Sequence, residues 1–150
     1  MLKHIPSILT PELLKVLMEM GHGDEIVIAD GNFPAASIGK RLIRLDGHSV
    51  PKVLEAILQL LPLDTYTEKP IALMEVVPGD PIVPTIWEKY ESIILTKEPK
   101  RNNTDYIDFM ERFAFYERAK NAYAVIAIGE TEIYANILLK KGAVLPEEIL

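Results

Sequence analysis

The sequence predicts an α/β fold with three layers, in which helices cover both faces of a mostly parallel β-sheet. Along the 150 residues, amphipathic segments with helical spacing alternate with short apolar segments that resemble strands. The strand-like segments are continuously apolar, which is typical of strands buried on both faces. No repeat, low-complexity tract or linker divides the chain. We therefore expect a single domain over residues 1–150.

The first half of the chain is predicted to hold two helices and three strands. Thr10–Glu12 has the composition of a helix start, with a hydroxyl side chain, a proline at the first helical position and an acidic residue. Gly21 ends this helix, and His48–Pro51 opens the next one. In order, we expect a helix at 11–20, strands at 25–29 and 41–45, a helix at 48–61 and a strand at 71–77.

In the second half, a turn at 78–81 precedes a helix at 85–95 that carries the only tryptophan. Thr104 is expected to cap a further helix over 104–120. We interpret Asn102–Thr104, which matches a glycosylation acceptor, as part of that cap. The remaining elements are a polar loop at 97–103, a strand at 123–128, a turn at 129–132 and a last strand at 136–139.

The composition excludes several classes of protein. Hydrophobic residues make up 49% of the chain, which excludes disorder as the default. The net charge of −6 argues against a nucleic-acid-binding groove, and no apolar run approaches the roughly 20 residues that span a bilayer. The absence of cysteine excludes disulfides, thiolate metal sites and cysteine nucleophiles. Because prolines and charged residues interrupt the N-terminal segment, we expect no signal peptide and a cytoplasmic protein.

The segment Met20–Asp30 holds the most informative residues. His22 lies between two glycines, and histidine can give and take a proton near neutral pH. Asp30 follows the buried strand at 25–29, and ligand sites of open α/β sheets lie at the carboxyl ends of strands. Simpler interpretations stay open, because His22 could cap the preceding helix and Asp30 could only form a turn.

Two later segments also carry polar side chains that suit a ligand. Tyr134 and Asn136 alternate along an extended segment, so a phenol and an amide share one face and can read the hydroxyls of a carbohydrate. Arg112 and Arg118 lie on a predicted helix among aromatic residues. The alternatives are cross-strand packing for the first pair and a solvated helix face for the second.

We predict no cofactor and no metal. Gly21–Gly23 is glycine-rich but precedes a strand, whereas a dinucleotide-binding loop follows a strand and opens a helix. The sequence has no phosphate-binding loop and no nucleophile-elbow serine. Its three histidines are scattered, which disfavours a multi-histidine metal site, although His22 with Asp24 or Glu25 could contribute ligands.

Four motifs in register resemble those of the RbsD/FucU family. They are Met20–Asp24, Ala29–Pro34, Arg112–Arg118 and Tyr134–Gly142, and their order and spacing match over about residues 1–142. The Arg112–Arg118 block favours the fucose branch of the family over its ribose pyranase branch. Residues 143–150 extend past the last motif, and we assign them no role.

The resemblance implies a fold, a reaction and a site. The fold would be a Rossmann-like α/β subunit, the RbsD-like fold, assembled into rings that are commonly decamers. The reaction would be the interconversion of the α and β anomers of L-fucose, an isomerisation by acid–base ring opening and closure without a cofactor. By position, His22 would be the proton donor, and the sugar-binding residues would be Asp30, Arg112, Tyr134, Ala135 and Asn136.

Other functions stay open at this point. The protein could exchange the forms of D-ribose or of another monosaccharide, it could be a non-catalytic sugar-binding accessory protein, or it could be a structural oligomer without a ligand. The expected partners are therefore a monosaccharide and further copies of the chain, with no nucleic acid and no membrane.

The spacing of His22 and Asp30 predicts a site shared between subunits. A strand of five residues at 25–29 spans about 16 Å, which is much longer than a pyranose ring. One chain should therefore not place both side chains on one sugar. We expect His22 or the Arg112 helix of one chain to combine with Asp30 and Asn136 of another.

Overall fold

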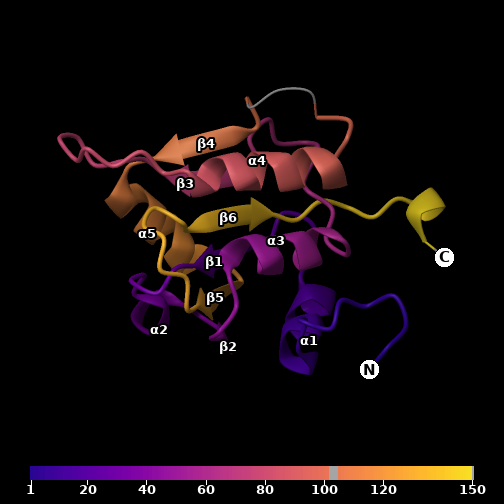
Figure 1. Ribbon diagram of the computed structural model, residues 1–150. Coiled ribbons are helices and arrows are strands. Elements are labelled where there is room, and N and C mark those ends of the chain that lie inside the picture. The colour runs from indigo at the N-terminus through magenta and orange to yellow at the C-terminus, as the bar shows by residue number, and fades with distance from the viewer. Residues whose placement is uncertain (102–104, 150) are drawn as a thin grey trace.

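The computed structural model describes residues 1–101 and 105–149 and has the predicted three-layer architecture (Figure 1). The strands are β1 (Glu25–Ala29), β2 (Leu42–Leu45), β3 (Ile71–Met74), β4 (Ile107–Met110), β5 (Ala124–Ile128) and β6 (Ile137–Lys140). The helices are α1 (Pro11–Glu19), α2 (Ala35–Ile38), α3 (Val50–Leu58), α4 (Ile86–Lys97) and α5 (Arg112–Asn121), with a short 3-10 turn, η1 (Pro146–Glu148).

The described residues form one sheet with the strand order β2-β5-β1-β6-β3-β4. Five strands run in the same direction, whereas β6 is antiparallel to both of its neighbours, β1 and β3. The sheet is therefore mostly parallel, as the sequence predicts.

The four central strands, β5, β1, β6 and β3, are buried on both faces, which explains why their sequences are almost continuously apolar. Along β1, Ile26 and Ile28 belong to a large apolar cluster with α1, α3 and α4, whereas Val27 and Ala29 belong to a smaller cluster with α2 and α5. Successive side chains of a strand point to opposite faces, so each strand contributes to both clusters.

One predicted helix is wrong over its first part. We expected a helix over 104–120, but Ile107–Met110 forms the edge strand β4, which pairs in parallel with β3. Helix α5 begins only at Arg112, because the side chain of Glu111 accepts the N–H groups of Phe113 and Ala114 at 2.9 and 3.1 Å and caps it there. The expected cap at Thr104 lies outside the described residues.

Two smaller differences concern the length of one strand and one short helix. The strand predicted at 71–77 ends at Met74, where the chain leaves the sheet toward the turn at 78–81. The sequence analysis also missed α2, whose four residues are too few for a helical pattern to be recognised.

The direction of β6 determines where its flanking residues lie. Ile137 pairs with Ile28 at the carboxyl end of β1, and Lys140 pairs with Glu25 at its amino end. The residues before β6 therefore lie at the edge where the parallel strands end, and those after β6 lie at the opposite edge. No helix among the described residues is both long enough and apolar enough to span a membrane.

Candidate functional site

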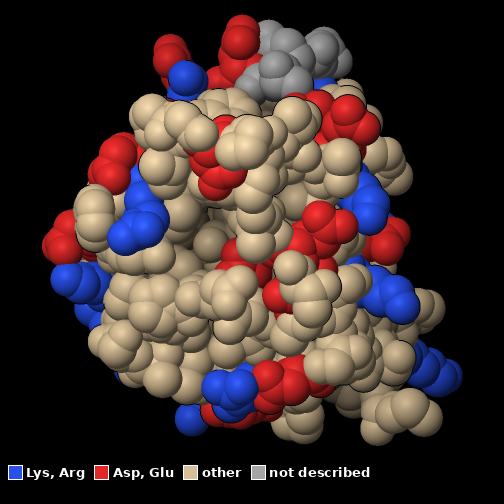
Figure 2. Space-filling model, turned by 60° about the vertical axis from the view of Figure 1, so that its left-hand side comes forward, with Lys and Arg blue, Asp and Glu red and all other residues tan. Residues whose placement is uncertain are grey.

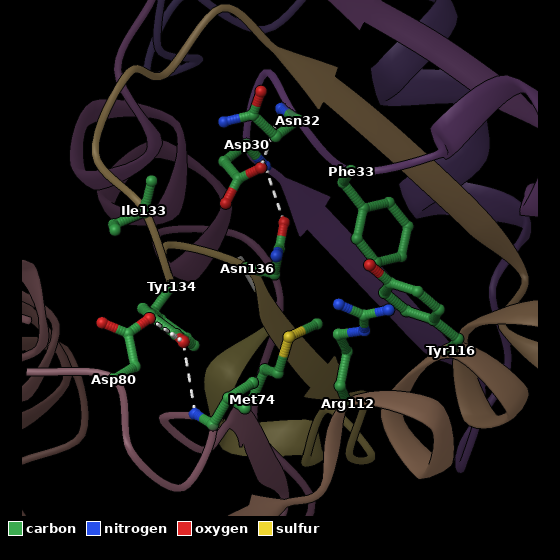
Figure 3. Close-up of a pocket in the computed structure, with 11 residues that line it drawn as sticks. Asp30, Asn32, Phe33, Met74, Asp80, Arg112, Tyr116, Ile133, Tyr134 and Asn136 are labelled. Carbon is green, nitrogen blue, oxygen red and sulfur yellow. Dashed lines mark hydrogen bonds between the residues drawn. The ribbon is translucent and has the colours of Figure 1, made fainter. Parts of the chain in front are cut away.

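A cavity opens at the edge of the sheet where the parallel strands end (Figure 3). Its volume of about 240 Å³ is smaller than the roughly 300–1,000 Å³ of pockets for drug-sized ligands, so it suits a ligand of about one sugar ring. Figure 2 shows a hollow in this part of the surface, with acidic and basic side chains around it. The lining residues are Asp30, Asn32, Phe33, Met74, Val77, Asp80, Arg112, Tyr116, Ile133, Tyr134 and Asn136.

Asp30 follows β1 directly and supplies a nearly buried carboxylate, with 5% of its surface exposed. Its Oδ1 accepts the N–H of Asn32 at 3.0 Å. Burial raises the pKa of the Asp30 carboxyl, neighbouring backbone N–H groups partly offset this effect, and the nearby carboxylate of Glu130 adds to it. A buried carboxylate has more acceptor positions than these N–H groups fill, and it gains from a ligand hydroxyl that donates to it.

Asn136 precedes β6 and is also buried. Its Oδ1 accepts the backbone N–H of Asp30 at 2.8 Å, across the pairing of β6 with β1. Because a backbone N–H can only donate, the amide oxygen must face it. The amide nitrogen is therefore the part of Asn136 left to donate to a ligand in the cavity that it lines.

Tyr134 has a left-handed backbone with φ of 58°, which is uncommon for a residue with a bulky side chain. Its hydroxyl donates to Asp80 Oδ2 at 2.7 Å and accepts the N–H of Val77 at 3.2 Å (Figure 3). Its carbonyl accepts the indole N–H of Trp87 at 2.8 Å. Contacts from α4 and from the loop after β3 therefore hold this strained residue in place, as is common at ligand sites.

Ala135 is fully buried and is not among the residues that line the cavity. Its carbonyl accepts the hydroxyl proton of Tyr90, on α4, at 2.5 Å. In this chain Ala135 fixes the segment between Tyr134 and Asn136. Its predicted contact with a sugar stays a prediction.

Arg112 is the first residue of α5 and gives the cavity its positive charge. Its guanidinium carbon lies 4.7 Å from the ring centre of Phe113 and 5.8 Å from that of Tyr116. Within the described part of the chain, this guanidinium makes no hydrogen bond and no ion pair, so its N–H groups are available to oxygen atoms of a ligand.

His22 does not reach this cavity, because it lies before the amino end of β1. Its Nε2 is 2.9 Å from Oδ1 of Asp64, and its ring centre lies 5.2 Å from that of Tyr66. The His22 side chain is 45% exposed, whereas that of Asp64 is 3% exposed. The structure thus pairs His22 with a buried carboxylate rather than using it to cap α1.

Asp64 is held as an anion despite its burial. Burial opposes its ionisation, but hydrogen bonds from Thr67, His22 and the N–H of Tyr66 outweigh that effect and lower its pKa to about 2. An anion at this position pairs with the His22 ring and fixes its orientation.

The residues after β6 hold this pair together. The carbonyl of Lys141 accepts the N–H of Gly23, beside His22, and the N–H of Asp64 donates to the carbonyl of Lys140. At Gly142 an added Cβ would lie 2.7 Å from the carbonyl oxygen of Leu63, so only glycine allows this close approach. The Tyr134–Gly142 motif therefore serves both edges of the sheet.

Sequence reasoning missed two aspartates, Asp64 and Asp80. Both lie in loops, where aspartate is frequent for reasons of turn formation alone. No spacing pattern connects Asp64 with His22, which lies 42 residues earlier. Among the residues that the structure describes, no group of three or more His, Cys, Asp or Glu side chains is placed to hold a metal ion.

The structure brings together four predicted residues in one chain: Asp30, Arg112, Tyr134 and Asn136. One of the two alternatives for a shared site had a second chain supply Arg112. That alternative is not needed, because Arg112 lines the same cavity as Asp30 and Asn136 of its own chain. His22 lies at the opposite end of β1, about 16 Å of strand away from Asp30. The alternative in which a neighbouring chain supplies His22 stays a prediction.

The fold and the cavity together define a class of protein. It is an α/β protein with a small cavity at the carboxyl edge of a mostly parallel sheet, lined by groups that are able to hydrogen-bond to the hydroxyls of a small ligand. The model of the RbsD / FucU transport protein family matches residues 3–144. The chain belongs to the RbsD/FucU family.

Individual relatives agree with this assignment. The chain is 50% identical to the fucose mutarotase of Bos taurus, over 99% of this chain and 97% of the relative. A crystal structure of the fucose mutarotase from Streptococcus pneumoniae in complex with L-fucose superposes with a TM-score of 0.91 at 51% identity, over 96% of this chain and 100% of that one. Bacillus subtilis RbsD complexed with D-ribose has a TM-score of 0.70 at 23% identity, over 97% and 100%, and shares the fold.

Proposed function

We propose that this protein is an L-fucose mutarotase, an isomerase that interconverts the α and β anomers of the sugar. The observation that carries the proposal is the cavity, in which a carboxylate, a guanidinium, an amide and a phenol surround a space for one sugar ring. The fucose mutarotases that resemble this chain over nearly its full length support the choice of sugar.

Exchange of anomers requires two proton transfers and one reversible bond cleavage. An acid protonates the ring oxygen, a base takes the proton of the anomeric hydroxyl, and the bond between C1 and the ring oxygen breaks to leave an aldehyde. The aldehyde rotates, and the reverse transfers close the ring on its other face. General acid–base catalysis contributes about 10²–10⁴-fold to such a step.

The residues suit these two roles. His22 would protonate the ring oxygen and recover the proton on ring closure, with Asp64 orienting its ring. Burial raises the pKa of Asp30, which makes its carboxylate a stronger base for the proton of the anomeric hydroxyl. Arg112 and the amide nitrogen of Asn136 would position other sugar oxygens.

We further propose that His22 acts on a sugar held by a neighbouring chain, in a homo-oligomer that the resemblance suggests is a decameric ring. The separation of His22 from Asp30 along β1 supports this arrangement.

Saturation-transfer NMR on the anomeric protons of L-fucose, with D-ribose in parallel, tests the reaction. We expect catalysed exchange with L-fucose and a loss of about 100-fold or more in His22→Ala. His48→Ala is the matched control, because His48 is exposed and lies outside the cavity and the His22–Asp64 pair. Binding without exchange would instead identify a sugar-binding accessory protein, and faster exchange of D-ribose would change the substrate.

Co-expression of two inactive variants tests the shared site. In mixed oligomers of His22→Ala and Asp30→Asn chains, half of the chains keep His22 and the other half keep Asp30. If each site takes these two residues from different chains, random assortment gives roughly a quarter of sites with both native residues. We therefore expect activity to return to about that fraction. If both residues acted within one chain, the mixture would stay inactive.

A further inference from the structure

The loop between β3 and α4 contributes a second carboxylate to the cavity, and the proposed reaction does not use it. Asp80 is half-buried, and its two oxygens have different partners. Oδ1 accepts the N–H of Ile82 at 3.2 Å and so shapes its own loop, whereas Oδ2 accepts the hydroxyl proton of Tyr134 at 2.7 Å. Asp80 therefore joins the loop to the sugar-binding segment (Figure 3).

These contacts determine what the Tyr134 hydroxyl can offer a ligand. A phenol has one proton to donate and two lone pairs that accept, and an ionised carboxylate can only accept. The proton of Tyr134 is therefore committed to Asp80, and one lone pair takes the N–H of Val77 at 3.2 Å. The group that remains for a ligand is the second lone pair, which can only accept.

We propose that Asp80 is a positioning residue that makes Tyr134 a hydrogen-bond acceptor toward the sugar, so that the cavity selects a sugar hydroxyl that donates at this point. The inference rests on the proposed function, because it concerns the same cavity and the same class of ligand. It also gives Tyr134 a role in recognition in place of one in proton transfer, because its proton is already held by a carboxylate.

The substitution Asp80→Asn reverses this arrangement with little change in shape. The amide oxygen can still accept the N–H of Ile82, but an NH₂ group then faces the hydroxyl of Tyr134. The NH₂ group donates to the phenol, whose proton becomes free to point into the cavity. In this variant Tyr134 can donate to the ligand, and the preference of the cavity should change.

Binding of L-fucose and of its 2-, 3- and 4-deoxyfluoro derivatives measures this preference, because fluorine replaces a hydroxyl without being able to donate. For wild type, we expect one of the three positions to lose about 10-fold or more in affinity, as when a buried acceptor loses its donor. In Asp80→Asn and in Tyr134→Phe, the selective loss at that position should fall to within about 3-fold. The fluorescence of Trp87, which bonds to the carbonyl of Tyr134, reports binding.

The double variant Asp80→Asn/Tyr134→Phe distinguishes positioning from direct contact. If Asp80 acts through Tyr134, the double variant has the selectivity of Tyr134→Phe alone. An unchanged effect of Asp80→Asn in the Tyr134→Phe background would overturn the proposal, because Asp80 would then contact the sugar itself. Equal weakening at all three positions would also overturn it, since it would indicate only a disturbed loop.

Two controls keep these outcomes separate from folding and from the proposed function. Thermal unfolding establishes that each variant is folded, and Glu132→Gln removes an equivalent charge from an exposed residue of the same segment. A wild-type protein that exchanges L-fucose anomers but shows no selective position refutes the inference alone. A wild-type protein that neither binds nor exchanges L-fucose refutes the proposed function, and the inference with it.

Discussion

Asp30 and Asp64 are both buried aspartates, yet their surroundings shift the pKa of the two carboxyl groups in opposite directions. Burial raises the pKa of Asp30, and the backbone N–H groups around its carboxylate, among them that of Asn32 at 3.0 Å, offset this only in part. Asp64 is at least as buried, but bonds from Thr67, His22 and the N–H of Tyr66 lower its pKa to about 2. The two residues lie at opposite edges of the sheet.

The difference indicates which carboxylate is prepared for a ligand. Asp64 already has its hydrogen-bond partners, so it stabilises the folded chain and orients His22. Asp30 is charged at a cost to stability, and that cost is recovered only when a ligand donates to it. Two aspartates at opposite ends of one fold thus distinguish a structural carboxylate, Asp64, from the one that we propose binds the sugar, Asp30.

The largest effect that follows is on catalysis at Asp30. Asp30→Asn should reduce kcat/KM for anomer exchange by about 100-fold or more, because the base and the acceptor for a sugar hydroxyl are both lost. The free energy of unfolding of this variant at neutral pH should stay the same or rise by up to about 1 kcal/mol. The reason is that burial, which raises the pKa of Asp30, makes its charged form unfavourable, and asparagine carries no charge.

The control for this prediction is Asp46→Asn, which removes an exposed carboxylate after β2 at the same edge of the sheet. It should change neither activity nor stability appreciably, since exposed ion pairs such as Asp46 with Arg44 contribute little. If Asp30→Asn destabilised the fold by several kcal/mol, Asp30 would be structural and the comparison with Asp64 would fail.

A smaller effect is expected at Asp64, on stability rather than on sugar affinity. In Asp64→Asn, an amide NH₂ replaces an oxygen that accepts an N–H, so one donor loses its partner. We expect the free energy of unfolding to fall by about 2–3 kcal/mol, the value of hydrogen bonds to a charged group. Urea unfolding at neutral pH measures it, and a loss below about 0.5 kcal/mol would contradict the structural role.

The smallest expected effect is on the pH dependence of the free energy of unfolding, to which Asp30 and Asp64 should contribute with opposite signs. The lowered pKa of Asp64 contributes up to about 2 kcal/mol of stability above its ordinary pKa of 3.8, and this is lost as pH falls toward about 2. The raised pKa of Asp30 has the reverse effect, because its cost to the fold disappears as pH falls and the group becomes protonated.

Urea unfolding of wild type and both variants between pH 7 and pH 2 tests these signs. The stability difference of Asp64→Asn from wild type should shrink between about pH 4 and pH 2. Any advantage of Asp30→Asn over wild type should disappear as pH falls. Parallel curves for all three proteins would show that neither carboxylate is linked to folding as described.

Several elements could be predicted from local sequence because local interactions determine them. Thr10–Glu12 starts α1, where the side chain of Thr10 accepts the N–H of Leu13 at 3.2 Å, and the continuously apolar segment at 25–29 is a central strand. Strand β4 could not be predicted, because it is an edge strand that pairs with β3, more than 30 residues earlier in the chain. The helical pattern nearby therefore suggested the wrong element.

By itself, the sequence determined the α/β class, the start of the central elements and the polar residues Asp30, Arg112, Tyr134 and Asn136 as candidates for a sugar site. Only the tertiary structure decided how they are combined, because that depends on the antiparallel direction of β6. This direction places Asn136 beside Asp30 at one edge and Lys141 beside the His22–Asp64 pair at the other. Strand direction and pairing are set by contacts between distant segments, and a local pattern of residues does not encode them.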